Sequence, residues 1–252
     1  MRRIGPVVLA LALAGCGLWA RRPGLAPGTT IETLLAGLDA RRAAVHSLRA
    51  RAQIRSGLAQ VWVREAVVVE RPRAVRVDVL SPFGLALALG TDGSMLWVYP
   101  PQEGIRYEGE ATPENVARFL GAAVSSEDLV DVLLGVPPRR IPVAPPRSRV
   151  MGDGMLRVIV PFADGEQRLD FAGRPAELRR AEEARTDGLV MRVDFDDYRD
   201  GFPWRMDIHG TEGTTASLRY VEVEPNVTVD TAVFRGPAAT RVLPLESIEL
   251  RR

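Results

Sequence analysis

The sequence predicts a mainly β protein with a few helices, in which about eleven antiparallel strands form an unclosed barrel. From Leu48 onward, apolar residues recur at every second position in runs that turn residues separate, as in half-buried strands. Three amphipathic segments with helical spacing accompany these strands, and short helices of this kind need an apolar surface on which to lie. A large twisted sheet whose cavity the helices plug or cover would bury both sets of apolar faces.

The composition limits the classes of function. The 252 residues are 46% hydrophobic and 26% charged, so the chain can bury a substantial core, and its formal net charge of +1 disfavours an electrostatic nucleic-acid binder. One cysteine and two histidines exclude an intrachain disulfide framework and disfavour most transition-metal sites. The chain has no hydrolase, nucleotide-binding or metalloprotease pattern, so we expect no enzymatic activity, no catalytic residue, no metal and no cofactor.

The N-terminal segment is typical of an export signal. Two arginines after Met1 precede the apolar run 4–14, which has the length of a signal peptide and is too short to span a bilayer. Leu13-Ala14-Gly15-Cys16 then resembles the lipobox of bacterial lipoproteins, in which the cysteine is acylated after cleavage. We therefore expect residues 1–15 to be a signal peptide and Cys16 to be lipidated. An ordinary secretory signal followed by a buried cysteine is the alternative.

The residues after the lipobox favour one membrane and a flexible attachment. In lipoproteins of enteric bacteria an aspartate after the acylated cysteine often marks inner-membrane retention, and this chain has Gly17 there. We therefore expect an outer-membrane lipid anchor with the domain facing the periplasm. Residues 16–29 are rich in glycine and proline, which is typical of a flexible tether.

The first helix is expected from Thr30 to His46. Thr30 is a suitable N-cap, and the apolar residues that follow keep largely to one face. The spacing changes to strand-like alternation at Leu48, and the following segments are separated by turn residues. The strands expected here are Leu48–Arg55, Leu58–Glu70, Ala74–Leu80, Leu85–Thr91, Met95–Tyr99 and Ile105–Glu108.

Two short helices are expected in the middle of the chain. Thr112 provides an N-cap before Pro113, and Ser125 or Ser126 caps a second helix that ends at Gly135. The strands expected after them are Met155–Phe162, Gln167–Phe171, Ala176–Ala184, Leu189–Phe195, Trp204–His209 and Ala216–Val223. We assign residues 30–240 to one half-barrel domain and residues 241–252 to a polar tail.

Two segments resemble a known family. Residues 79–87, around Ser81-Pro82-Phe83-Gly84, resemble a strand–loop–strand of the LolB-like outer-membrane lipoproteins, which belong to the LolA/LolB lipoprotein-carrier superfamily. Residues 129–137 resemble the second helix of that family and its Leu-Gly-x-Pro stop. The resemblance implies an unclosed eleven-stranded barrel that holds the acyl chains of a lipoprotein in transit. It also implies a LolA-like periplasmic carrier as a partner, and an apolar loop residue, here Phe83, that delivers cargo to the membrane.

Large apolar side chains provide the candidate site residues. An aromatic residue in a turn is costly unless it meets a membrane or a partner, so we expect Pro82, Phe83, Gly84 and Leu85 to form a membrane-insertion loop. The alternative is that Phe83 folds back onto the barrel rim. Residues expected to line or cover the cavity are Trp62, Trp97, Tyr99, Phe119, Leu120, Leu129, Leu133 and Trp204.

The resulting functional hypothesis is a lipoprotein that binds acyl chains in an apolar cavity. Such a protein would help receive or insert lipoproteins or other lipids at the outer membrane. The expected partners are lipid or lipoprotein acyl chains, the outer membrane and a LolA-like carrier, without nucleic acid. The alternative is a structural or scaffold lipoprotein of an envelope complex, with the same fold and a cavity that its own helices plug.

Overall fold

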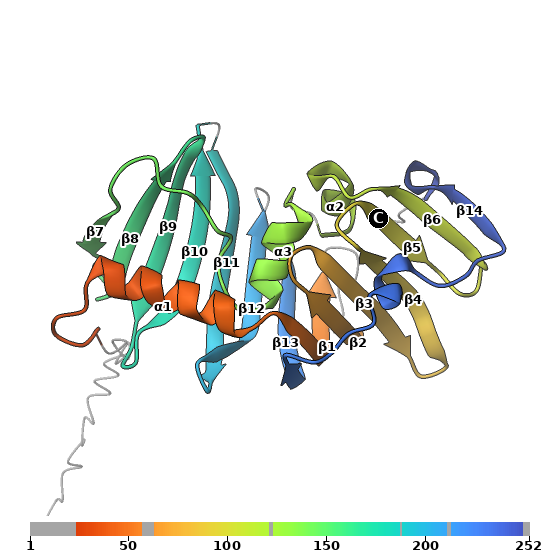
Figure 1. The fold of residues 1–252 in the computed structure, drawn as a ribbon, viewed down its shortest axis with the longest axis horizontal. Helices are drawn as coiled ribbons and strands as arrows, with labels where there is room; N and C mark the ends of the chain where they lie inside the picture. The colour runs from red at the N-terminus through yellow and green to blue at the C-terminus, as the bar shows by residue number, and fades with distance from the viewer. Residues whose placement is uncertain (1–23, 57–62, 121–122, 187, 211–212, 249–252) are drawn as a thin grey trace, which may run out of the picture.

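The computed structural model describes residues 24–56, 63–120, 123–186, 188–210 and 213–248 (Figure 1). The first strands along the chain are β1 (Ser47–Ser56), β2 (Val63–Glu70), β3 (Ala74–Ser81), β4 (Gly84–Thr91), β5 (Met95–Tyr99) and β6 (Ile105–Glu110). The strands that follow are β7 (Arg147–Val150), β8 (Leu156–Phe162), β9 (Gly165–Ala172), β10 (Glu177–Arg185), β11 (Gly188–Arg199), β12 (Phe202–Gly210), β13 (Gly213–Pro225) and β14 (Arg241–Pro244).

These fourteen strands of the described residues form one open sheet in the order β14-β6-β5-β4-β3-β2-β1-β13-β12-β11-β10-β9-β8-β7. Neighbouring strands are antiparallel, apart from the parallel pair β14 and β6. The pairing of β1 with β13 joins the two halves of the chain into a single sheet. The predicted mainly β, unclosed antiparallel fold is confirmed, with more strands than the eleven expected.

Three α-helices of the described ranges accompany the sheet, and their ends follow the capping chemistry of the sequence. They are α1 (Ile31–Ala44), α2 (Pro113–Leu120) and α3 (Ser126–Leu133). The Thr30 hydroxyl accepts a hydrogen bond from the backbone N–H of Thr33 at 3.2 Å, which caps α1. The Ser125 hydroxyl caps α3 in the same way, and Gly135, with a φ of 76° just after the C-cap Leu134, closes a Schellman motif that stops the helix. The predicted N-caps and the glycine stop are therefore confirmed.

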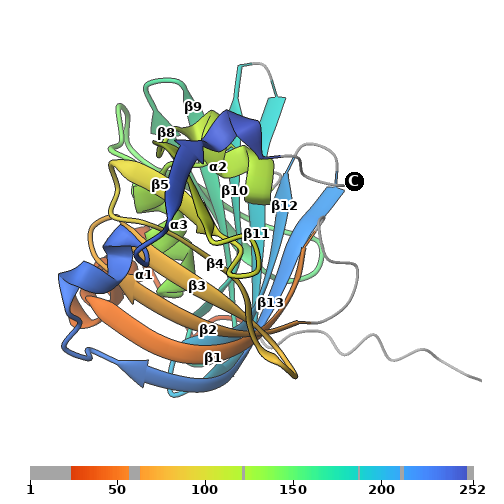
Figure 2. The same cartoon turned by 90° about the vertical axis from the view of Figure 1, so that its right-hand side faces the viewer.

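The helices pack on the inner face of the curved sheet, where the core lies. Figure 1 shows α1 crossing the β8–β12 part of the sheet, and Figure 2 shows the sheet curving around α3. Apolar residues from all three helices belong to the same buried cluster as the strands, among them Leu38, Val116 and Val130. Each short helix therefore contributes its apolar stripe to one common core. Within the described ranges, no helix has the length and apolar character that a bilayer crossing requires.

The C-terminal segment differs from the polar tail expected at residues 241–252. Its first residues form β14 and pair with β6, and Leu245 just beyond them is fully buried. Residues 249–252 lie outside the described residues. A four-residue strand gives too little alternation to be recognised from sequence, and β7, which was also missed, is equally short. β14 pairs with β6, which lies far earlier in the chain, and β7 forms the opposite edge of the sheet.

Candidate functional site

An apolar cavity lies between the inner face of the sheet and helices α2 and α3. Its volume is about 90 Å³, and among the described residues no charged side chain lines it. The helices contribute Val116 and Phe119 from α2, and Leu129 and Leu133 from α3. The strands contribute Ile54, Val75, Val77, Leu89, Gly90, Thr91, Leu96, Ile208, Ala216 and Leu218. This chemistry suits hydrocarbon and offers almost nothing to a polar ligand.

The size of the cavity limits what it holds in the observed conformation. Sites for small molecules usually enclose roughly 300–1,000 Å³, whereas this cavity encloses about 90 Å³. Side chains of α2 and α3 form one wall of this small space. An acyl chain therefore needs these two helices to shift before it can lie along the strands.

Three of the residues expected to line or cover the cavity meet there. Phe119, Leu129 and Leu133 come from α2 and α3 and share its lining. Trp62 lies outside the described residues, as does the side chain of Leu120, although the backbone of Leu120 belongs to α2. Helical spacing was the signal that identified this set, since it placed their apolar side chains on the faces that must be covered.

The two aromatic residues of β5 do not lie in the cavity, which corrects the expectation. Trp97 is only 1% exposed, and its indole N–H donates to the carbonyl oxygen of Phe234 at 2.6 Å. Its side chain therefore lies on the opposite face of the sheet from that of Leu96, which lines the cavity. Tyr99 shares that outer face because strand residues alternate. The backbone at Gly90 approaches the Trp97 ring so closely that an added Cβ would lie 2.7 Å from it. Trp97 is therefore a core residue beneath the C-terminal segment.

Trp204, on β12, is half-buried against the main core and does not line the cavity. The guanidinium group of Arg199 lies over its ring at 4.3 Å from the centroid, which is a cation–π arrangement.

Sequence reasoning missed the strand residues that do line the cavity, such as Val77, Leu89 and Ile208. Alternation marked them as inward-facing, but nothing in the sequence said which inward positions α2 and α3 leave partly uncovered.

The hairpin between β3 and β4 presents an apolar tip. Phe83 is 100% exposed, Pro82 and Gly84 are also exposed, and Leu85 is half-buried. The Ser81 hydroxyl accepts a hydrogen bond from the N–H of Phe83 at 3.2 Å and donates one to the carbonyl of Gly84 at 3.0 Å. These bonds hold the turn so that the ring points away from the protein. The alternative in which Phe83 folds back onto the rim is not observed.

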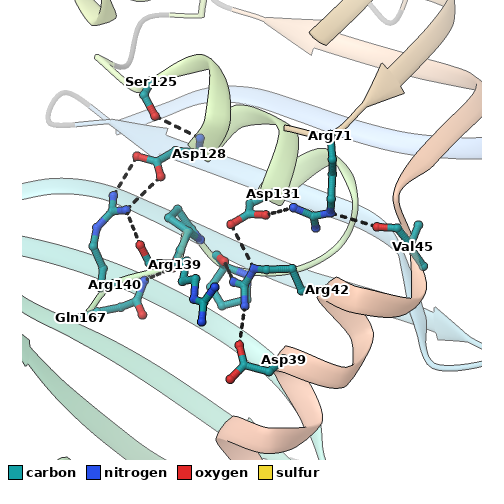
Figure 3. A network of polar contacts seen from close by, with 12 residues as sticks. Asp39, Arg42, Val45, Arg71, Ser125, Asp128, Asp131, Arg139, Arg140 and Gln167 are labelled. Carbon is teal, nitrogen blue, oxygen red and sulfur yellow. Dashed lines mark hydrogen bonds and ion pairs between the residues drawn. The ribbon is translucent and has the colours of Figure 1, made fainter. Parts of the chain in front are cut away.

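A buried carboxylate joins α3 to its surroundings (Figure 3). The Asp131 side chain accepts hydrogen bonds from Arg42 Nε at 3.4 Å and from Arg71 Nη1, and these arginines come from α1 and from the turn between β2 and β3. Arg42 also donates to the Pro137 carbonyl at 2.7 Å, and Arg71 donates to the Val45 carbonyl at 3.0 Å. We call this set the Asp131 clamp, because it ties the helix over the cavity to two separate parts of the protein.

A second polar cluster holds the start of α3 (Figure 3). Arg140 donates two hydrogen bonds to Asp128, at 2.8 and 2.9 Å, and two to Glu183 on β10, at 2.5 and 2.9 Å. Burial alone would lower the pKa of Arg140, but the hydrogen bonds and charges of these carboxylates outweigh it and raise the pKa. No spacing in the sequence indicated either cluster, because their members are brought together only by the tertiary fold.

Another buried carboxyl faces the apolar interior. Glu65, on β2, is almost fully buried on the same strand face as Val67 and Val69. Burial raises the pKa of Glu65 to about 7. The inner face of the sheet therefore holds a carboxyl group that stays partly protonated at neutral pH.

Comparison with known proteins supports the fold. No protein-family model matches the chain, and no curated protein matches it by sequence. Among solved structures it is similar to a DUF1329 family protein from Desulfovibrio piger, with a TM-score of 0.50 and 14% identity over 79% of this chain and 96% of that chain. A LolA superfamily protein from Nitrosomonas europaea is also similar, with a TM-score of 0.48 and 14% identity over 75% of this chain and 89% of that chain. At such low identity, the first likeness shows a shared fold and no function.

Proposed function

We propose that this protein is an outer-membrane lipoprotein, anchored through Cys16 and facing the periplasm, that binds acyl chains beneath α2 and α3. It would help receive or insert lipoproteins or other lipids at the membrane, with a LolA-like carrier as donor. The observation that carries the proposal is the cavity on the inner face of the sheet, whose described lining holds no charged side chain. Burial of hydrocarbon is the one interaction that such a lining offers strongly.

The energetics of opening are consistent with this role. Each buried methylene contributes about 0.8 kcal/mol, whereas loss of a buried ion pair costs about 3–5 kcal/mol. Insertion of about five methylenes therefore offsets the rupture of the Asp131 clamp as α3 shifts. Cargo then moves in the direction of greater affinity: from a donor to this cavity, and from the cavity to the bilayer.

The exposed hairpin provides the membrane contact in this proposal. Phe83 projects fully into solvent, and Leu80, three residues earlier on β3, is also exposed. An apolar tip of this kind gains free energy when it enters the acyl boundary of a bilayer. The hairpin would thereby bring the barrel close enough to the membrane for cargo to leave.

The test is a titration of the full chain carrying Cys16→Ala with a fluorescent acyl lipid, followed by displacement with a triacylated lipopeptide. We expect saturable binding that the lipopeptide reverses. Leu129→Trp fills the cavity and should weaken binding, whereas Val221→Trp, at an exposed position on β13, is the matched control. Circular dichroism verifies that both variants are folded. Equal binding by the two variants would place the lipid elsewhere.

The second candidate function is a scaffold lipoprotein with the same fold. The small cavity volume of about 90 Å³ favours it, because this is well below the size that ligand sites usually have. In this case the helices stay in place and the protein acts through its surface. Absence of acyl-lipid binding by the folded protein would support the scaffold and refute the carrier.

A further inference from the structure

A groove separate from the cavity lies beneath α1, on the part of the sheet that contains β8 and β9. It encloses about 220 Å³ between α1, the connector of residues 137–142, and strands β8 and β9. Leu35 and Leu38 of α1 form one wall, and Val160 and Leu169 of the strands form another. It has no lining residue in common with the cavity beneath α2 and α3. The groove is therefore a separate apolar space.

The connector that forms the third wall is held in a defined position. The Gln167 amide donates to the Pro138 carbonyl at 2.8 Å, and the N–H of Val143 donates to the Pro161 carbonyl at 3.0 Å. Between these two attachments Ile141 is 79% exposed and still lines the groove. An isoleucine fixed at the mouth of an apolar groove extends the apolar wall outward, and it becomes buried when a chain lies against it.

The charges at the mouth are mainly positive. Asp39, Arg42, Arg139 and Arg140 are the charged residues of the lining. Arg42 is bound by Asp39 and Asp131, and Arg140 is bound by Asp128 and Glu183. Arg139 is exposed and has no ion pair with any carboxylate of the described ranges; Figure 3 shows it beside Arg42 and Asp39. Its guanidinium group is thus available to a ligand of the groove, whose lining includes this exposed residue.

We propose that this groove binds one long-chain fatty acid, with the hydrocarbon against Leu35, Leu38 and Ile141 and the carboxylate on Arg139. A guanidinium group matches a carboxylate with two parallel hydrogen bonds, which is the strongest pairing that this side chain makes. The volume of about 220 Å³ suits part of one chain better than the two chains of a phospholipid. The inference shares the lipid-handling role with the proposed function but places this ligand at a different site.

The test uses cis-parinaric acid, a fatty acid that fluoresces when it is bound, and the full chain carrying Cys16→Ala. Ile141→Asp places a charge against the hydrocarbon and should weaken binding at least about five-fold. Val143→Asp, two residues further along the same connector, is the matched control, because Val143 is also exposed but does not line the groove. We expect its affinity to equal that of the parent chain.

The carboxylate contact is tested by charge reversal. Arg139→Glu should lower the affinity for cis-parinaric acid about three-fold or more at low salt. The affinity for hexadecanol, which has no charge and is measured by displacement of the probe, should stay unchanged. Arg149→Glu, at an exposed position on β7, is the control for net charge. Salt should reduce the affinity of the parent chain and have little effect on Arg139→Glu.

The outcomes separate this inference from the carrier hypothesis. Loss of fatty-acid binding in Ile141→Asp and Arg139→Glu, with normal binding of the acyl lipid in the cavity, supports a second site. Normal fatty-acid binding in both variants overturns it. Loss in Leu129→Trp alone also overturns it, because the fatty acid would then occupy the cavity beneath α2 and α3.

Discussion

Asp131→Ala tests whether the Asp131 clamp holds α3 over the cavity. The Asp131 side chain is 4% exposed and contacts two arginines, Arg42 from α1 and Arg71 from the turn between β2 and β3. The substitution leaves both guanidinium groups largely buried and without that carboxylate. The contacts between α3 and the rest of the protein then depend on apolar packing and on the second polar cluster at Arg140.

The structure sets the expected magnitude. Removing one partner of a buried ion pair costs about 3–5 kcal/mol. Arg42 retains its bonds to Asp39 and the Pro137 carbonyl, and Arg71 retains its bond to the Val45 carbonyl. Because these contacts still satisfy part of each guanidinium group, we expect the free energy of unfolding to fall by about 3 kcal/mol, the lower end of that range.

Asp39→Ala is the matched control, because Asp39 pairs with the same Arg42 at 3.0 Å but is 61% exposed. Exposed ion pairs contribute at most about 1 kcal/mol, so this variant should lose less than that. Urea unfolding, followed by circular dichroism, measures the free energy of unfolding of both variants. Equal losses in Asp131→Ala and Asp39→Ala would refute the reasoning that burial gives the clamp its strength.

The same pair of variants tests whether α3 moves. If α3 shifts when acyl chains enter, weakening the clamp lowers the free energy of opening and the affinity for acyl lipid rises. Asp131→Ala should therefore bind the fluorescent acyl lipid more tightly at a temperature where it remains folded, and Asp39→Ala should bind like the parent chain. Unchanged affinity in folded Asp131→Ala would contradict the displacement of α3.

Three further predictions concern the anchor, the hairpin and the buried carboxyl. Cys16→Ala should move the protein from the membrane to the soluble fraction on cell fractionation, and retention at the membrane would contradict lipid anchoring. Phe83→Glu should leave the melting temperature unchanged, because the side chain is fully exposed, while it lowers the rate of acyl-lipid transfer to vesicles; a large loss of stability would instead show that Phe83 belongs to the core. For Glu65, the rise in pKa from 4.5 to about 7 means that the folded state keeps a proton that the unfolded chain releases, so stability falls as pH rises through this window. Glu65→Gln should remove this dependence and raise the free energy of unfolding at pH 8 by on the order of 3 kcal/mol. Glu70→Gln, on the same strand, is the control for the substitution. If the free energy of unfolding varied with pH in the same way in the parent and in Glu65→Gln, the effect would be excluded.

The sequence by itself determined most of the local elements and the inward-facing positions of their strands, while the short β7 and β14 escaped it. Alternation at Val75 and Val77 predicted β3, and the capping residues Thr30 and Ser125 predicted where α1 and α3 begin. These signals are local because a strand or a helix turn repeats within a few residues, and a cap acts on the next three. The turn at Ser81-Pro82-Phe83-Gly84 also followed from local chemistry, but the turn residues alone left open whether Phe83 projects outward or folds back, and its full exposure is seen only in the structure.

Only the tertiary structure decided which apolar residues form the cavity and which polar residues close it. Trp97 and Leu96 are adjacent in the chain, yet one lies beneath the C-terminal segment and the other lines the cavity, because β5 has two faces and both are covered. The Asp131 clamp joins residues 60 and 89 positions apart, and β14 depends on β6 across more than a hundred residues. Contacts of such long range leave no periodic pattern in the sequence. The residues around each partner reflect only the strand or helix that contains it, and the twist and register of the whole sheet decide which of these elements come into contact.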